Sequence, residues 1–228
     1  SARARGSAYT PPSEVECVLP YQVLGPFSEI EMVNAPDLLY LAGDQSLLRG
    51  TKRVAIVGSR SASEAGKKRA GQLARALARE GVVVVSGLAA GIDKAAHDGA
   101  LRGGGRTIAV IGTPVDRAYP AANAALQESI YQHHLLVSQF APGQRTFPSD
   151  FVKRNRTMAL ICHASVIVEA GETSGTLSQA REMTRLGRPL FFMQSLLDNP
   201  DLEWPQRFQK TGAKVLGNVQ QILEAIES

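Results

Sequence analysis

Residues 53–87, with the sequence RVAIVGSRSASEAGKKRAGQLARALAREGVVVVSG, decide the fold class of this chain. The segment opens with an apolar run at 54–57 that ends in glycine, which is typical of a buried parallel strand. A helical pattern follows, and we expect Ser61 to cap this helix, with Glu64 three residues later closing a capping box. The four valines at 82–85 then form a second buried strand. Strand, helix and strand in this order predict two parallel strands joined by a right-handed crossover.

The same alternation of strands and helices continues to the end of the chain. It predicts an α/β chain with an extended Rossmann-like, doubly wound, mostly parallel sheet that has helices on both faces. Residues 1–16 are expected to form a flexible tail. Residues 17–50 are expected to be an N-terminal extension that could hold an edge strand at 37–44, and residues 51–228 to be the Rossmann-like domain. Further strands are expected at 107–111, 135–138, 165–169, 188–193 and 214–216, and helices at 123–132, 150–162, 174–186 and 219–226, with one more from about residue 90.

Composition limits the classes of function. In 228 residues, 44% are apolar and 20% are charged, which is enough apolar material for a packed core, and the net charge of +4 is a mild preference for anionic partners. Cys17 and Cys162 lie far apart without Cys/His spacing, so neither a disulfide framework nor a metal site is expected. No run of about 18 apolar residues and no secretory signal is present, so we expect no membrane contact and a cytoplasmic location.

Several loops that follow the predicted strands combine glycine with hydroxyl or cationic side chains. Ligands of open α/β sheets bind beyond the carboxyl ends of the strands. Glycine lets the backbone approach a ligand closely, and free N–H groups at the following helix start attract anions. Arg60 adds a planar donor suited to phosphate, although glycine there could also serve only to make tight turns. The segments concerned are 58–60, 86–93, 112–114 and 170–176.

A second signal is the run KRNRT at 153–157, which is expected at the start of a helix. Lys153 and Arg156 are three residues apart and share a helix face, whereas Arg154 is expected to point away from it. Cations are unfavourable near a helix N-terminus, so their presence favours a bound anion, and we expect Lys153 and Arg156 to form the charged part of a pocket. The run KKR at 67–69, in contrast, is typical of a solvated helix face, with an auxiliary contact to a nucleic acid as the alternative.

Acidic and aromatic residues near these loops are assigned supporting roles. Asp93 is expected to hold the glycine loop before it, and Glu169 and Glu172 to orient arginines such as Arg156. Asn155 is expected to bond the backbone or a neighbouring loop as readily as a ligand. Aromatic residues make up only 6% of the chain, so affinity for a nucleic acid would come mostly from phosphates. The side chains that could stack on bases are Tyr119, Phe147 and Phe151.

Five segments together resemble the DNA-processing protein A (DprA, also called Smf) family. The resemblance covers about residues 38–193 and, more weakly, 212–226. It implies an extended Rossmann fold that binds single-stranded DNA without strong sequence preference and is not an enzyme. It also implies protection of incoming DNA, loading of RecA recombinase in natural transformation, and a homodimer. The segments are VAIVGSR at 54–60, VVVVSGLAAGIDKAAHDGAL at 82–101, GGRTIAVIGTPVDRAYPAAN at 104–123, FPSDFVKRNRT at 147–157 and VIVEAGETSGTLSQA at 166–180.

The resemblance also indicates which residues would contact the nucleic acid. No catalytic residue, cofactor or metal is implied. The resemblance does not extend to the family's C-terminal winged-helix domain, so the chain is expected to be a divergent or trimmed member that lacks it. Loop chemistry and resemblance together give these phosphate-binding candidates: Gly58, Ser59, Arg60, Ser86, Gly87, Gly91, Lys153, Asn155, Arg156, Ser174, Gly175 and Thr176.

Two other functions of the same superfamily stay open. The lysine-decarboxylase-like phosphoribohydrolases (the LOG family) carry GGxGTxxE with a catalytic glutamate. Gly175 and Thr176 match the GT of that motif, but Gln179 occupies the position of the acid. An amide cannot act as a general base, which counts against hydrolysis. The third alternative is a sensor domain that binds a small phosphorylated nucleotide through the same loops.

Overall fold

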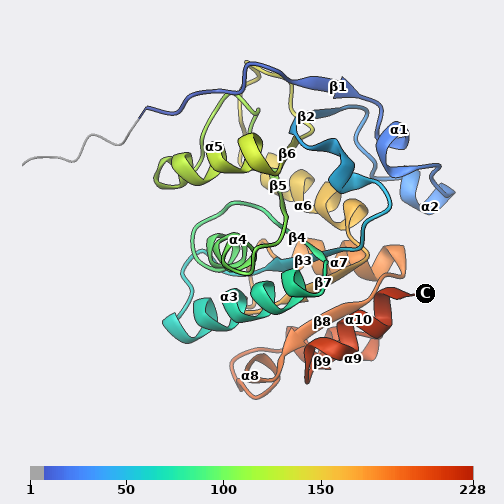
Figure 1. Cartoon of the computed structure of the whole chain (residues 1–228). Coiled ribbons are helices and arrows are strands. Elements are labelled where there is room, and N and C mark those ends of the chain that lie inside the picture. The colour runs from blue at the N-terminus through green and yellow to red at the C-terminus, as the bar shows by residue number, and fades with distance from the viewer. Residues whose placement is uncertain (1–7, 228) are drawn as a thin grey trace, which may run out of the picture.

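One sheet runs through the described part of the chain, residues 8–227 of this computed structural model (Figure 1). Its nine strands in these residues are β1 (Glu16–Val18), β2 (Leu39–Gly43), β3 (Arg53–Val57), β4 (Val83–Ser86), β5 (Thr107–Ile111), β6 (Leu135–Ser138), β7 (Ala164–Ile167), β8 (Leu190–Met193) and β9 (Lys214–Leu216). Their order is β1-β2-β6-β5-β4-β3-β7-β8-β9, and every pairing from β6 to β9 is parallel. The predicted fold class is therefore confirmed, with the strand order reversing direction between β3 and β7.

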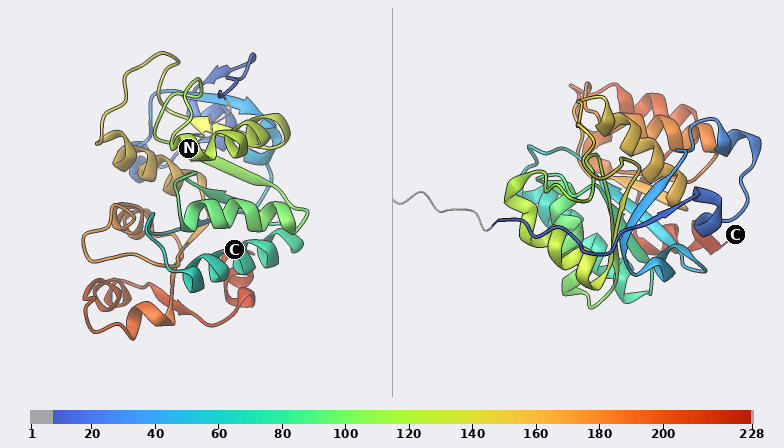
Figure 2. Two further views of the ribbon diagram at one scale, coloured as in Figure 1. Left: turned by 90° about the vertical axis from the view of Figure 1, so that its left-hand side faces the viewer. Right: turned by 90° about the horizontal axis from the view of Figure 1, so that it is seen from above.

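Helices cover both faces of this sheet. The helices of the described residues are α1 (Pro20–Leu24), α2 (Glu29–Met32), α3 (Glu64–Arg79), α4 (Ile92–Arg102), α5 (Ala124–His133), α6 (Asp150–Ile161), α7 (Leu177–Leu186), α8 (Gln194–Leu197), α9 (Trp204–Lys210) and α10 (Val219–Glu227), with short 3-10 turns at Gln45–Leu48 and Ala121–Asn123. Figure 2 shows α6 and α7 on one side of the strands and α3, α4 and α5 on the other. None of these helices is long and apolar enough to cross a bilayer.

Burial on both faces explains the uninterrupted apolar runs of the strands. Along β3, Ala55 and Val57 belong to the core beneath α6, α7 and α9, whereas Val54 and Ile56 belong to the core beneath α3, α4 and α10. Successive side chains of a strand point to opposite faces, so a strand covered on both sides is apolar at every position.

The start of α3 differs from the prediction. Ser63, not Ser61, is the N-cap, and its Oγ accepts a hydrogen bond from the backbone N–H of Gly66. The carboxylate of Glu169, two residues after the end of β7, accepts hydrogen bonds from both the N–H and the hydroxyl of Ser63, at 2.8 and 2.5 Å. This contact between distant parts of the chain fixes the helix start two residues later than the local pattern indicates.

The N-terminal region also differs from the prediction. The strand expected at 37–44 forms as β2, but it is an inner strand, because β1 pairs antiparallel on its outer side. The expected flexible tail is wrong for Tyr9, whose hydroxyl donates to the carbonyl of Val115 at 2.7 Å and accepts from Gln127 at 2.9 Å. Residues 1–7 of that tail lie outside the described residues.

Candidate functional site

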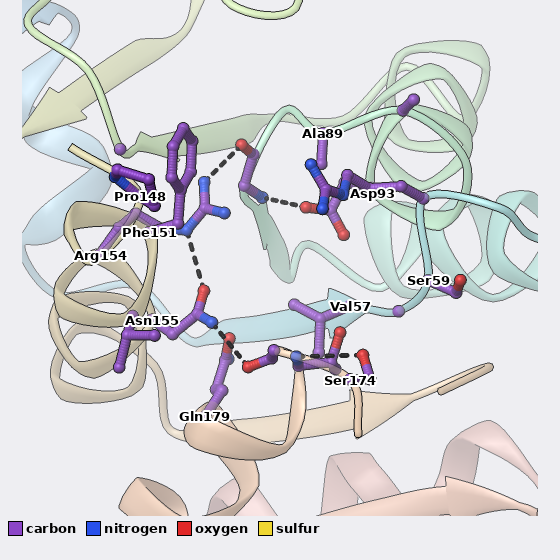
Figure 3. A pocket seen from close by; sticks show the side chains of 18 of the residues that line it. Val57, Ser59, Ala89, Asp93, Pro148, Phe151, Arg154, Asn155, Ser174 and Gln179 are labelled. Atoms are coloured by element: carbon purple, nitrogen blue, oxygen red, sulfur yellow. Dashed lines mark hydrogen bonds between the residues drawn. The ribbon is translucent and has the colours of Figure 1, made fainter. Parts of the chain in front are cut away.

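A cavity of about 870 Å³ lies at the carboxyl ends of the central strands (Figure 3). Its position between β3 and β7 is the topological switch point, where open α/β sheets bind ligands. Loops after β3, β4, β5 and β7 and the start of α6 form its walls. Its lining includes Val57, Gly58, Ser59, Arg60, Ser61, Gly87, Ala89, Asp93, Arg117, Tyr119, Phe147, Phe151, Arg154, Asn155, Thr173, Ser174, Gly175, Thr176 and Gln179.

The structure brings most of the predicted phosphate-binding residues together around this cavity. Eight of the candidates line it, namely Gly58, Ser59, Arg60, Gly87, Asn155, Ser174, Gly175 and Thr176. Ser86 does not, because its buried hydroxyl donates to the carbonyl of Ile56 at 2.6 Å. Gly91 has a positive φ of 78°, and a Cβ there would lie 2.4 Å from the carbonyl oxygen of Ser59. Ser86 and Gly91 therefore shape the loops that surround the cavity.

The predicted orientation of the KRNRT run is wrong. Lys153 and Arg156 are exposed and lie outside the cavity lining, and Lys153 is 3.7 Å from the Asp150 carboxylate. Arg154, expected to point away, is 7% exposed and lines the cavity. The apolar side of α6, which includes Met158 one turn further on, faces the sheet and turns Arg154 inward with it.

Arg154 is held by the loops around it (Figure 3). Its Nη1 donates to the carbonyls of Gly87 and Val110, at 2.7 and 3.1 Å, and its Nε donates to Oδ1 of Asn155 at 2.9 Å. The guanidinium also lies 5.6 Å from the centre of the Phe151 ring. Arg154 therefore fastens α6 to the loops after β4 and β5, and its side-chain donors point largely into protein rather than toward a ligand.

Asp93 complements Arg154 on the other side of Gly87. Its Oδ2 accepts from the backbone N–H of Gly87 at 3.2 Å, which confirms that Asp93 holds the glycine loop. A Cβ on Gly87 would lie 2.7 Å from Arg154 Nη1 and 2.8 Å from Asp93 Oδ2, so only glycine fits between the two charges. Burial raises the pKa of Asp93 and lowers the pKa of Arg154, while the opposite charge of each partner acts against that shift.

The loop before α7 is held in place by Asn155. Its Nδ2 donates to the carbonyl of Gly175 at 3.1 Å and to the hydroxyl of Ser178 at 2.9 Å. The N–H of Thr176 donates to the Ser174 hydroxyl at 3.2 Å. Open space lies beside Gly175, so a ligand can approach the backbone at this helix N-terminus, where the helix dipole favours an anion.

Two arginines supply the uncommitted positive charge of the cavity. Arg60 and Arg117 line it and are exposed, and neither forms an ion pair within residues 8–227. The prediction included Arg60 but missed Arg117, which lies in the loop after the strand 107–111. The sequence analysis had already selected this loop for its glycine and threonine at 112–114. Extending the selected segment by three residues would have included Arg117.

Aromatic side chains form one rim of the cavity. The rings of Tyr119 and Phe151 lie 5.4 Å apart, and Arg145 lies 5.3 Å from the centre of the Phe147 ring. Tyr119 and Phe147 are 41% and 48% exposed, so each has a ring surface open to a stacking partner. The three aromatic candidates named from the sequence thus all line the cavity.

The acidic residues of the loops do not orient Arg156. Glu169 accepts from Ser63, and Glu172 accepts from the N–H groups of Glu203 and Trp204 and from Arg207. Gln179, at the position of the hydrolase acid, is buried, and its Nε2 donates to the Ser165 hydroxyl at 3.0 Å. Within the described residues, no three His, Cys, Asp or Glu side chains gather as they would around a metal ion.

The sequence comparisons identify one family, and the solved structure of a member superposes well. The family model described as DNA recombination-mediator protein A matches residues 25–227. The chain is 40% identical over 203 residues to DNA processing protein DprA of Streptococcus pneumoniae, covering 89% of this chain and 71% of that protein. The solved structure of the Streptococcus pneumoniae protein superposes with a TM-score of 0.84 at 36% identity, covering 95% of this chain and 76% of the other.

A second solved structure is similar over almost its whole length. It is a structure of DNA processing protein A from Helicobacter pylori that addresses the single-stranded DNA binding mode of that protein. The TM-score is 0.79 at 28% identity, and the match covers 92% of this chain and 94% of the other.

Proposed function

The chain belongs to the DNA recombination-mediator protein A family, and on this premise we propose that it binds single-stranded DNA with little sequence preference. One observation carries the proposal. The cavity at the switch point offers donors for phosphate from two sides, namely the 58–60 loop with Arg60 and the 174–176 loop at the start of α7. Contacts to phosphates position a strand without reading its bases, which accounts for weak sequence preference. The Helicobacter pylori relative, studied for its binding of single-stranded DNA, supports this assignment.

Some polar groups of the cavity are hydrogen-bonded to its loops, and others are free to bind a ligand. Asp93 and Arg154 hold the Gly87 loop and Asn155 holds the loop before α7, so the donors of the 174–176 segment are preorganised before a ligand arrives, whereas the Arg60 side chain is free. The exposed rings of Tyr119 and Phe147 provide stacking surface for unpaired bases, which a duplex would not present. Lys153 and Arg156 lie outside the cavity, and their contact with the strand stays a prediction.

Salt-dependent binding tests this function. Fluorescence anisotropy would measure the affinity of labelled oligo-dT and of a labelled mononucleotide between 50 and 300 mM salt. Arg60→Gln is expected to weaken oligonucleotide binding about tenfold, equally for all base compositions, because it removes one charge-assisted phosphate contact. Lys210→Gln, an exposed lysine on α9, is the control for charge alone. Equal affinity of the mononucleotide and oligo-dT at low salt would contradict strand binding and favour the nucleotide sensor.

Hydrolysis is tested separately. The catalytic carboxylate of the phosphoribohydrolases would have to act from the position of Gln179, which here is a buried amide bonded to Ser165. Release of ribose 5-phosphate from AMP, abolished by Gln179→Ala, would overturn a purely binding role.

The wider role rests on family membership alone. We propose that the protein protects incoming DNA and loads RecA recombinase in natural transformation, and that it acts as a homodimer. Light scattering of the free protein, and capture of purified RecA by the DNA-bound protein, test the two partner assignments.

A further inference from the structure

Helix α3 carries a narrow row of cations on its exposed face. Lys68, Arg75 and Arg79 are all exposed, and with Gln72 they follow the spacing i, i+4, i+7, i+11. At 100° per residue these positions fall within about 60° of one another around the helix, so they form a single straight row. The row is about 16 Å long, given a rise of 1.5 Å per residue.

A fourth cation reaches this row from the neighbouring helix. Arg102 lies at the end of α4, which packs beside α3 (Figure 1). A Cβ placed on Gly71 would lie 2.8 Å from Nη2 of Arg102, so the guanidinium rests against α3 between Lys68 and Arg75. We call these four residues, Lys68, Arg75, Arg79 and Arg102, the α3 basic track.

The charges of the track are not paired with acidic side chains within residues 8–227. None of its four side chains forms an ion pair or a side-chain hydrogen bond there. Two acidic residues nearby are engaged elsewhere, with Glu64 bonded to Lys67 at 3.0 Å and Asp98 bonded to Lys94 at 2.5 Å. Glu80, just past the helix end, has no such partner and reduces the excess by one charge.

Only one member of the KKR run therefore belongs to the track. Lys67 pairs with Glu64, and Arg69 donates to the Ser195 hydroxyl at 3.3 Å. Arg75 and Arg79 are like charges at i, i+4, an arrangement that destabilises a helix. A solvated face gains nothing from that arrangement, whereas a bound polyanion offsets it.

A loop that lines the cavity leads into the helix that carries the track. The 58–61 loop lines the cavity and leads into α3, so Arg60 and Lys68 are separated by the loop end and the first turn of the helix. A strand that left the cavity past Arg60 and followed α3 would meet Lys68 next, and then Arg102 and Arg75. A row one side chain wide matches one phosphate backbone, whereas a duplex presents two.

We propose that the α3 basic track binds the phosphate backbone of the single strand as it leaves the cavity, which makes α3 and α4 part of a longer binding path. The inference rests on the proposed function, since it needs a strand held in the cavity. It assigns a role to four cations that the family motifs and the cavity leave unexplained.

The test compares a short and a long oligonucleotide. The variant is Lys68→Gln/Arg75→Gln/Arg79→Gln, and the probes are labelled dT6, a short strand, and dT24, a long one. For dT24, the slope of log K against log salt is expected to become shallower by about 2, because each of the three lost phosphate contacts contributes about 0.7 to the slope. Raising the salt from 50 to 200 mM weakens the binding of dT24 in both proteins, and the factor by which it weakens is expected to be about 16 times smaller for the variant than for the wild type. Its affinity for dT6 is expected to stay within twofold of the wild type.

The control is Lys52→Gln/Lys210→Gln/Lys214→Gln, which removes the same charge from exposed lysines outside the track. An equal loss of slope in the control, or an unchanged slope in the track variant, would overturn the inference while leaving strand binding intact. A larger loss for a 24-base-pair duplex than for dT24 would overturn it as well. Failure of the wild type to bind either oligonucleotide would instead refute the proposed function. Single substitutions such as Arg75→Gln, each expected to reduce the dT24 slope by about 0.7, serve if the triple variant unfolds.

Discussion

Replacing Arg154 with methionine is the most direct test of how the site is built. Methionine keeps much of the length of the side chain and removes its charge and all its donors. The carbonyls of Gly87 and Val110 then lose the contacts they make at 2.7 and 3.1 Å. The buried carboxylate of Asp93 also loses the positive charge that lowers its pKa.

The expected loss is about 3–5 kcal/mol of unfolding free energy, because two buried carbonyls lose their donor, at about 1–3 kcal/mol each, and the buried Asp93 carboxylate loses the positive charge near it. Arg154 is 7% exposed, so water does not replace the lost donors fully. Arg156 lies two residues after Arg154 in the same helix, is exposed and has no ion pair within the described chain. Arg156→Met is therefore expected to change the unfolding free energy by no more than about 0.5 kcal/mol. The two substitutions are chemically identical and differ only in which side of α6 they occupy.

Urea denaturation followed by circular dichroism would measure both variants. Adding Asp93→Asn to Arg154→Met should recover part of the loss, because the buried carboxylate is then no longer uncompensated. A change below about 1 kcal/mol for Arg154→Met, or equal changes for Arg154→Met and Arg156→Met, would refute the assignment of Arg154 as the buried member of the run.

Three further predictions concern stability. Gly91→Ala is expected to lower the unfolding free energy by about 1–3 kcal/mol, because φ is positive there and a Cβ would meet the Ser59 carbonyl. Thermal denaturation would measure the loss, and an unchanged Tm would contradict the predicted clash with Ser59. Burial lowers the pKa of His97 to about 3. Below about pH 6.5 the unfolded chain therefore takes up a proton on this imidazole while the folded chain does not. His97 alone should lower the unfolding free energy by about 2 kcal/mol between pH 7 and pH 5. Urea titrations of wild type and His97→Asn across that range should therefore converge as the pH falls, and parallel curves would count against it. Ser63→Ala should lower the unfolding free energy by about 1 kcal/mol, and Ser61→Ala should hardly change it, because Ser63 caps α3. A larger loss for Ser61→Ala would instead support Ser61 as the N-cap, as the sequence indicated.

The sheet was predictable because its central strands are buried on both faces. Thr107–Ile111 and Leu135–Ser138 have the bounds expected from the sequence, since every residue in them is apolar or bonded internally. The short edge strand Glu16–Val18 and helix Trp204–Lys210 were not predicted, because contacts distant in sequence form them. Trp204 donates through Nε1 to the carbonyl of Ala170, and no local pattern indicates that partner.

The site was predictable in its loops but not in its charges. Glycine and hydroxyl residues after the strands had to meet at one edge of the sheet, whatever the details of packing. Which cation of the KRNRT run faces inward depends on the rotation of α6 about its axis. Its core residues Met158 and Ile161 set that rotation, and Arg154 lies four and seven residues before them, on their side of the helix. Charge alone favoured Lys153 and Arg156, and the apolar spacing would have favoured Arg154.

The burial of Arg154 changes what salt dependence can reveal. Among the described residues that line the cavity, Arg60 and Arg117 are the arginines with exposed side chains, so a strand confined to the cavity should show a slope of only about −1.4. Hydroxyl and backbone donors at Ser59 and Ser174 add affinity without carrying a net charge, and so without steepening that slope. If the α3 basic track is engaged, a long strand should show a slope steeper by about 2 to 3. The difference between the slopes for dT6 and dT24 therefore counts the phosphates bound outside the cavity.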